Sequence, residues 1–257
     1  MLPKYQEVTC FNPKRLLLFS HTKVGKTTLL TALPNTLIID TEDGSEFIPG
    51  QKFNLIKESK LTGKGQFTLL KELSAEIEKA NKDKGDYVYD FIAIDTITGI
   101  EDLAAKVGTY LYKQTQIGKN FEGSDVVSEL PQGAGYMWLR KAFEQINKLF
   151  QGLSRNGIIY LGHVKQSSIT KIGKEFQAKD IALTGKLKLI ISAECDAIGY
   201  LYRDKENPNA CVVTFKTNEL DLATGARPNH LKNKEFVLSE STDNGMVFHW
   251  NKIYKEK

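Results

Sequence analysis

The stretch Ser20-His21-Thr22-Lys23-Val24-Gly25-Lys26-Thr27 decides how this chain of 257 residues folds. It follows the apolar run Leu16-Leu17-Leu18-Phe19 and leads into Thr28-Leu29-Leu30, so we expect a strand, a loop and a helix in immediate succession. Except at Ser20, the stretch fits the pattern G-x-x-x-x-G-K-[ST] of a phosphate-binding loop (P-loop), whose backbone N–H groups surround a phosphate. A nucleoside triphosphate is therefore the first ligand that the sequence predicts.

Two side chains of the P-loop have expected roles, since the lysine of this motif reaches the β and γ phosphates and the hydroxyl that follows holds Mg²⁺. These roles fall to Lys26 and Thr27. Ser20 replaces the first glycine, and its Cβ limits the backbone angles at that point. The alternative is a lysine and two threonines that merely open a surface helix, which the flanking strand and helix disfavour. The predicted nucleotide-binding residues of the loop are Ser20, His21, Thr22, Lys23, Val24, Gly25, Lys26, Thr27 and Thr28.

The composition is that of an ordinary globular protein, with 26% charged and 41% hydrophobic residues. A net charge of +4 is too small to indicate a nucleic-acid partner by itself. The chain has no apolar stretch of bilayer-spanning length and no signal-peptide layout at its start, so we expect a cytoplasmic protein without a membrane partner. Cys10, Cys195 and Cys211 lack the paired spacing of a zinc site or a disulfide framework.

Apolar strand-like runs alternate with segments of helical period as far as residue 162, which predicts an α/β fold with a mostly parallel sheet flanked by helices. We expect a single domain over residues 1–257, with an α/β core over about 10–200 and a β-rich, antiparallel extension over about 201–257. Polar stretches at about 114–135 and 163–180 interrupt the core, and loops of that length are usually functional or disordered. Expected strands cover residues 16–20, 36–40, 89–95, 157–162, 196–202, 211–216 and 235–238, and expected helices begin at 26 or cover 67–79, 99–112, 136–153 and 183–192.

Asp95 ends the buried-type run Phe91-Ile92-Ala93-Ile94, at a separation from the P-loop that suits a second Mg²⁺ ligand of an NTPase. An aspartate at this place is otherwise a helix cap. The predicted metal ligands are therefore Thr27 and Asp95.

Two further strand ends supply candidates for hydrolysis. Glu42 follows the strand after the P-loop helix and is placed to orient or deprotonate the attacking water; the alternative is a solvated acidic turn closed by Gly44, with Asp40 and Asp43 as weaker candidates. His163 follows a later strand and would emerge at the same sheet edge, where it would bond the γ-phosphate or serve only as an ordinary edge histidine. The predicted catalytic residues are Glu42, Lys26 and His163.

These motifs, in this order, resemble the ATPase core of the RecA/RadA recombinases. The matching segments are residues 20–27, 38–42, 92–96 and 160–165, and the similarity extends over about residues 10–230. The chain is more similar still to the short RecA-like ATPases of bacteriophages that support single-strand annealing and recombination. The resemblance implies a RecA-like P-loop NTPase that uses ATP and Mg²⁺, binds single-stranded DNA and forms homo-oligomeric rings or filaments in a bacterial or phage-infected cytoplasm.

The resemblance also implies roles for individual residues. In this family the glutamate that ends the second strand is the catalytic base, which supports Glu42. A polar side chain that ends the fourth strand, usually glutamine, senses the γ-phosphate, and His163 occupies that place. A lysine on a late strand contacts the nucleotide of the neighbouring subunit; Lys216 matches best and Arg227 is a looser candidate.

The polar stretch after His163 is where we expect single-stranded DNA to bind. Lysines neutralise backbone phosphates and an aromatic ring stacks on bases, whereas the alternative is a solvated lysine loop. The stretch 114–135 is a weaker second candidate because acidic residues accompany its Lys119 and Phe121. The predicted DNA contacts are Lys165, Lys171, Lys174, Phe176 and Lys179.

The leading hypothesis is an ATP-dependent ATPase that binds single-stranded DNA and hydrolyses ATP faster when DNA is bound. A small P-loop kinase is one alternative, but such kinases use cationic lid residues, usually arginines, and the loops here offer lysines. A regulatory ATP-binding protein of low turnover is the other, against which Glu42 argues.

Overall fold

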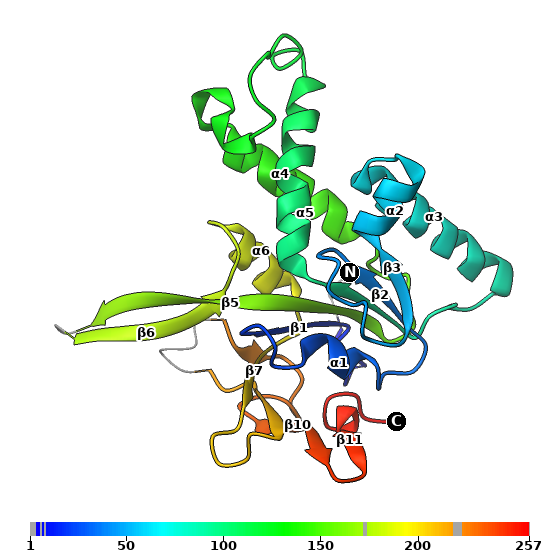
Figure 1. Cartoon of the computed structure of the whole chain (residues 1–257), viewed down its shortest axis with the longest axis vertical. Helices are drawn as coiled ribbons and strands as arrows, with labels where there is room; N and C mark the ends of the chain where they lie inside the picture. Colours follow the sequence, from blue (N-terminus) through cyan, green and yellow to red (C-terminus); the bar gives the residue numbers. More distant parts are fainter. Residues whose placement is uncertain (1–3, 6, 8, 172–173, 218–222, 257) are drawn as a thin grey trace.

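The computed structural model describes residues 4–256 except 6, 8, 172–173 and 218–222, and between residues 167 and 177 it describes the backbone only. Its central feature is one large twisted sheet with the strand order β11-β10-β8-β7-β1-β5-β4-β2-β3 (Figure 1). The strands from β7 to β3 are mutually parallel. They are β1 (Arg15–Ser20), β2 (Thr36–Asp40), β3 (Gln51–Asn54), β4 (Phe91–Asp95), β5 (Gly157–Lys171) and β7 (Ala197–Arg203).

The C-terminal strands are antiparallel and continue the same sheet beyond β7. They are β8 (Ala210–Thr214), β10 (Glu235–Thr242) and β11 (Gly245–Phe248), while the short β9 (Gly225–Ala226) pairs with β7. The predicted α/β fold, with a mostly parallel sheet and antiparallel C-terminal strands, is therefore confirmed.

Helices cover both faces of the sheet because the parallel strands are apolar on both sides. In β1, Leu17 and Phe19 join one buried cluster, whereas Leu16 and Leu18 join the other. The first cluster includes side chains of α2 (Leu55–Thr62), α3 (Gln66–Lys84), α4 (Ile97–Lys113), α5 (Gly135–Lys148) and α6 (Leu187–Glu194).

The second face is covered by the P-loop helix α1 (Lys26–Leu30) and by the C-terminal turn η3 (Trp250–Lys252). The indole Nε1 of Trp250 donates a hydrogen bond to the carbonyl oxygen of Leu29 (2.8 Å), and Ile253 packs into the same cluster. Helix α1 is short because Pro34 follows it, and proline cannot continue a helix. The C-terminal segment therefore packs against the last turn of α1.

The polar stretch after His163 is not the loop that the sequence predicts. It forms an antiparallel hairpin of β5 and β6 (Lys174–Ile181), in register from Val164 opposite Ile181 to Lys171 opposite Lys174. Figure 1 shows this arm projecting well beyond the rest of the molecule. Threonine, isoleucine and phenylalanine in the stretch favour strands, and the hairpin ladder satisfies the backbone polar groups of each strand.

Two elements between β2 and α3 were not predicted. Strand β3 is at the sheet edge and partly exposed, and α2 follows it directly. The signals for α2 are its ends: the Asn54 side chain accepts a hydrogen bond from the Lys57 N–H (2.9 Å), and Gly63 ends the helix with φ +69°. The stretch 114–135 is irregular, as expected, apart from the turns η1 (Val127–Glu129) and η2 (Pro131–Gly133). None of the described helices has the length and apolarity to cross a membrane.

Candidate nucleotide-binding site

The predicted P-loop, metal-binding and catalytic residues meet at the carboxyl edge of the parallel strands, which is where open α/β sheets bind ligands. Strand β5 lies between β1 and β4, and β2 lies on the other side of β4. In register, His163 is opposite Ser20, and Asp95 is opposite Asp40. The P-loop and the turn that contains Glu42 continue from these strand ends, so residues up to 143 positions apart in sequence share one edge.

The P-loop places Lys26 close to Ser20, the last residue of β1. Gly25 has φ +108°, a conformation that favours glycine, and it opens α1. The Lys26 Nζ donates hydrogen bonds to Ser20 Oγ (3.1 Å) and to the His21 carbonyl oxygen (3.0 Å), and Ser20 Oγ itself donates to the same carbonyl (2.7 Å). Ser20 is therefore a hydrogen-bond acceptor for the lysine, a role that a glycine at this position lacks and that sequence reasoning missed.

The Lys26 ammonium is short of countercharge. Its residue is only 7% exposed, and no described carboxylate lies within ion-pair distance of Nζ. Burial lowers the pKa of Lys26, and the more distant negative charges of Asp95 and Glu42 offset only part of this effect. A phosphate group would supply the missing negative charge.

Thr27 and Asp95 form the second pair at this edge. Thr27 Oγ1 donates a hydrogen bond to Asp95 Oδ2 (2.6 Å). Burial raises the pKa of Asp95, the Thr27 bond opposes the rise, and the charges of Asp40 and Glu42 add to it. The cap of α4 is Thr96, whose side chain accepts from the Gly99 N–H, so Asp95 is not the helix cap. A hydroxyl and a carboxylate side by side fit Mg²⁺, which prefers oxygen ligands.

Glu42 is held between two strands by hydrogen bonds to both of its oxygens. Oε1 accepts from the Thr96 hydroxyl, and Oε2 lies 3.2 Å from His163 Nε2. The two side chains remain partly open, with 39% of Glu42 and 27% of His163 exposed. The structure thus brings together the predicted base and the predicted γ-phosphate contact. Thr96 was missed, although its place directly after Asp95 at the strand end is a sequence signal.

Asp40 has a different role from Glu42 in the same acidic turn. It is 1% exposed and accepts hydrogen bonds from the Ser45 hydroxyl (2.5 Å) and from the backbone N–H groups of Ser45, Glu42 and Gly44. Burial would raise the pKa of Asp40, but these hydrogen bonds together hold it below its ordinary value. Asp40 closes the turn, and Glu42 is left as the open carboxylate.

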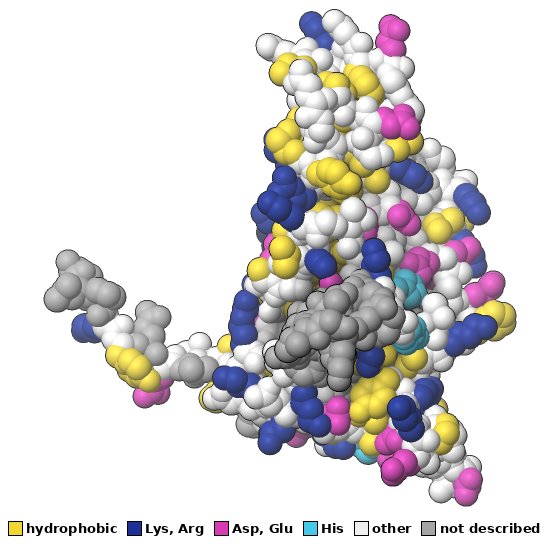
Figure 2. Space-filling view, turned by 90° about the vertical axis from the view of Figure 1, so that its left-hand side faces the viewer, with side chains coloured by type: hydrophobic (Ala, Val, Ile, Leu, Met, Phe, Trp, Pro, Cys, Tyr) yellow, Lys and Arg dark blue, Asp and Glu magenta, His cyan; other side chains and the backbone are white. Residues whose placement is uncertain are grey.

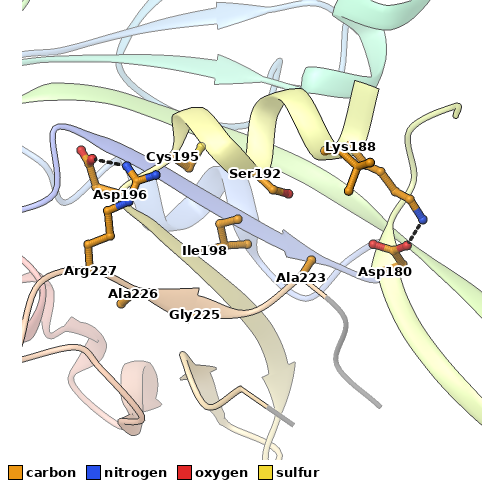
Figure 3. A pocket seen from close by; sticks show the side chains of 11 residues that line it. Asp180, Lys188, Ser192, Cys195, Asp196, Ile198, Ala223, Gly225, Ala226 and Arg227 are labelled. Carbon is orange, nitrogen blue, oxygen red and sulfur yellow. Dashed lines mark hydrogen bonds and ion pairs between the residues drawn. The ribbon is translucent and has the colours of Figure 1, made fainter. Parts of the chain in front are cut away.

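Lys216 and Arg227 lie apart from this cluster. Lys216 Nζ pairs with Glu235 Oε1 (2.9 Å). Arg227 pairs with Asp196 (3.2 Å), and Asp196 accepts from the N–H groups that begin β1, at the end of that strand opposite the P-loop. Figure 3 shows Arg227 lining a cavity of about 540 Å³ together with the ion pair of Asp180 and Lys188. Their role at a neighbouring subunit stays a prediction.

The predicted DNA contacts lie on the hairpin arm. Lys165 is exposed and follows His163 by two residues, while the Lys179 Nζ lies 4.4 Å from the centre of the Tyr200 ring. Lys171, Lys174 and Phe176 are on the arm's strands, but their side chains are outside what the structure describes. Figure 2 shows lysine and arginine side chains spread over the face from which the arm projects, with acidic side chains among them.

A P-loop at the end of β1, a hydroxyl–carboxylate pair suited to Mg²⁺ and a glutamate that follows a neighbouring parallel strand define a P-loop ATPase. The chain belongs to a family of AAA domains, because the model of the family described as "AAA domain" matches residues 12–232. Members of these ATPase classes generally use ATP and Mg²⁺.

Comparisons with other proteins give weaker likenesses. No curated protein matches the chain. Among solved structures it is similar to the crystal structure of the RadB recombinase, with 15% identity, a TM-score of 0.41, and coverage of 92% of this chain and 91% of that one. It is also similar to the pCW3 conjugation coupling protein TcpA in its monomer form with ATPγS, with 14% identity, a TM-score of 0.31, and coverage of 75% and 50%.

Proposed function

We propose that this chain is a single-domain, Mg²⁺-dependent ATPase that couples hydrolysis to single-stranded DNA, acts in phage-type recombination or single-strand annealing, and assembles into rings or filaments. The observation that carries the proposal is the course of β5. This strand presents His163 at the nucleotide edge and continues without a break into the hairpin arm with Lys165. One strand therefore joins the proposed γ-phosphate contact, His163, to the lysine-bearing arm.

The residues of the edge divide the chemistry among them. The P-loop backbone and Lys26 hold the phosphates, Thr27 and Asp95 hold Mg²⁺, and Glu42 orients or deprotonates the attacking water. Bound Mg²⁺ would neutralise charge on the phosphate oxygens. Glu42 suits a base because its carboxylate is partly open and both of its oxygens are positioned by hydrogen bonds.

Coupling to DNA would act through His163. In the structure its Nε2 bonds Glu42, and a γ-phosphate would offer it a second acceptor. A change of partner at His163 would shift β5 and with it the arm, where Lys165, Lys171, Lys174, Phe176 and Lys179 would contact phosphates and bases. In an oligomer, Lys216 or Arg227 would reach the nucleotide of the adjacent subunit.

The decisive experiment measures the rate of ATP hydrolysis with Mg²⁺ in the absence and presence of single-stranded DNA, with duplex DNA of the same length as the control. We expect stimulation by the single strand. A rate that depends on a small acceptor molecule would favour the kinase alternative. A rate that DNA leaves unchanged would contradict the proposed coupling.

The DNA site is tested with the double variant Lys171→Ala/Lys174→Ala on the arm. The matched control is Lys60→Ala/Lys79→Ala, which removes two exposed lysines from α2 and α3. The arm variant should weaken single-strand binding and reduce the slope of log affinity against log salt by about 0.7 per lost phosphate contact. Equal affinities of the two double variants would move the DNA site to another surface.

A further inference from the structure

Arg203 lies beside the P-loop, on the side where the sequence predicts no site residue. It is the last residue of β7, which runs parallel to β1 with Leu201 opposite Ser20, so Arg203 follows at the same carboxyl edge. A Cβ added to Gly25 would lie 3.3 Å from Arg203 Nη2. The guanidinium is therefore packed against the P-loop backbone, and Gly25 leaves room for it.

The guanidinium has spare hydrogen-bonding capacity. In the described part of the chain, Nη1 donates to the Asn209 carbonyl oxygen (3.2 Å), and no carboxylate lies within ion-pair distance of Arg203. By contrast, Arg155 pairs with two aspartates and Arg227 pairs with Asp196. Among the described residues, this half-buried cation has no countercharge, and it lies beside a loop whose backbone suits phosphate.

The strand order decides which part of a nucleotide would lie there. Strands β5, β4 and β2, which carry His163, Asp95 and the turn of Glu42, are all on one side of β1. Strand β7 and Arg203 are on the other side. A triphosphate whose γ-phosphate faces Glu42 and His163 therefore directs its α-phosphate and nucleoside toward β7.

We propose that Arg203 binds the α-phosphate of the nucleotide held by the P-loop of the same chain. This inference rests on the proposed function, because it takes the γ-phosphate to lie at Glu42. A guanidinium suits the role since its planar fork of donors matches two phosphate oxygens at once. Because ATP and ADP both carry an α-phosphate, Arg203 contacts both nucleotides. It therefore contributes to their affinity rather than to the hydrolytic step.

The test compares Arg203→Ala and Arg203→Lys with Lys205→Ala, which removes an exposed cation two residues away in the adjoining turn. Calorimetry measures binding of MgATP, MgADP and inorganic tripolyphosphate to each protein. For Arg203→Ala we expect roughly tenfold weaker binding of all three, a comparable rise in KM, and kcat within about twofold of wild type. Arg203→Lys should recover part of the affinity, and Lys205→Ala should match wild type.

Several results would overturn the assignment. Unchanged affinities of Arg203→Ala would remove Arg203 from the site while leaving the proposed ATPase intact. A loss for ATP and ADP but not for tripolyphosphate would place the guanidinium on the base or ribose, and a loss for ATP alone would place it on the γ-phosphate. Equal losses in Arg203→Ala and Arg203→Lys, with a lower melting temperature of each ligand-free protein, would show a structural role. Failure of the wild-type protein to bind any of the three would overturn the proposed function as well.

Discussion

Two pairs of cations differ in how their charge is balanced. Lys26 and Arg203 adjoin the P-loop and have no described carboxylate within ion-pair distance. Lys216 and Arg227 are paired with Glu235 and Asp196. A cation without a partner gains a full new interaction when phosphate binds, whereas a paired cation must first give up its carboxylate. Nucleotide capture should therefore depend mainly on the first pair.

The largest expected effect of breaking this contrast is at Lys26. Lys26→Ala removes the buried ammonium, so we expect hydrolysis to fall at least about 100-fold and ATP binding to weaken strongly. Steady-state ATPase rates and calorimetry measure both effects. Lys60→Ala, which removes an exposed lysine of α2, is the control and should match wild type. Near-normal turnover of Lys26→Ala would show that the P-loop is not the hydrolytic site.

The next largest effect is expected at Glu42, the proposed base, which acts on a nucleotide that the cations bind. Glu42→Gln keeps the shape and the hydrogen bond from Thr96 but cannot accept a proton, so kcat should fall by about 100-fold or more while the affinity for ATP stays within about threefold. Single-turnover kinetics and calorimetry separate the two quantities. Asp43→Asn, a neighbour in the same turn, is the control. A normal rate for Glu42→Gln would place the base elsewhere.

A smaller effect is expected at Lys216, because its charge is already paired with Glu235. Lys216→Ala should lower the ATPase rate by up to about tenfold if the lysine reaches the nucleotide of a neighbouring subunit. Mixing Lys216→Ala with Glu42→Gln subunits sharpens the test, since each supplies the group that the other lacks. Activity of the mixture above the sum of the two variants would support action across an interface. A purely additive rate would argue for a role within one subunit.

The smallest effect concerns the stability of the turn that presents Glu42. Hydrogen bonds hold the pKa of Asp40 below its ordinary value, so its carboxylate stabilises the folded state above the unfolded pKa, and this contribution is lost as the pH falls through the folded pKa. Asp40→Asn should lower the melting temperature by roughly 4–8 °C at neutral pH, corresponding to about 2 kcal/mol.

The deficit of Asp40→Asn should shrink as the pH is lowered into the acid range, because the wild-type protein then loses the same stabilisation. Thermal unfolding followed by circular dichroism at several pH values measures it. Asp43→Asn, with a more exposed side chain in the same turn, should show little change at any pH. A deficit of Asp40→Asn that is constant with pH would contradict the electrostatic account.

The sequence sufficed for features encoded locally. The apolar runs that end in Ser20, Asp40 and Asp95 fixed three parallel strands, and the parallel arrangement then placed their polar ends together. The arm was mistaken for a loop because its polar and charged residues hide its strand-forming pattern. Strand β3 and helix α2 were missed because both are short and partly exposed.

Long-range partners were harder to predict. Arg203 ends a strand that was predicted, but its approach to Gly25, 178 positions earlier in the sequence, depends on β7 lying beside β1. The sequence alone does not indicate that neighbour. Thr96 acquires its role only when β2 and β4 are adjacent. The sequence indicated only how the Cβ of Ser20 limits the backbone, whereas in the folded P-loop the Ser20 hydroxyl accepts a hydrogen bond from Lys26.

The bond between Trp250 and the last turn of α1 has a practical consequence. The chain has two tryptophans, and the other, Trp138, lies on α5 over the opposite face of the sheet. Helix α1 begins with Lys26 and Thr27, which are expected to bind phosphate and Mg²⁺. The indole of Trp250 contacts the other end of this helix and is therefore an intrinsic fluorescent probe of the site. With Trp138→Phe as background, the emission of Trp250 would follow nucleotide occupancy in real time, without a dye or a labelled ligand.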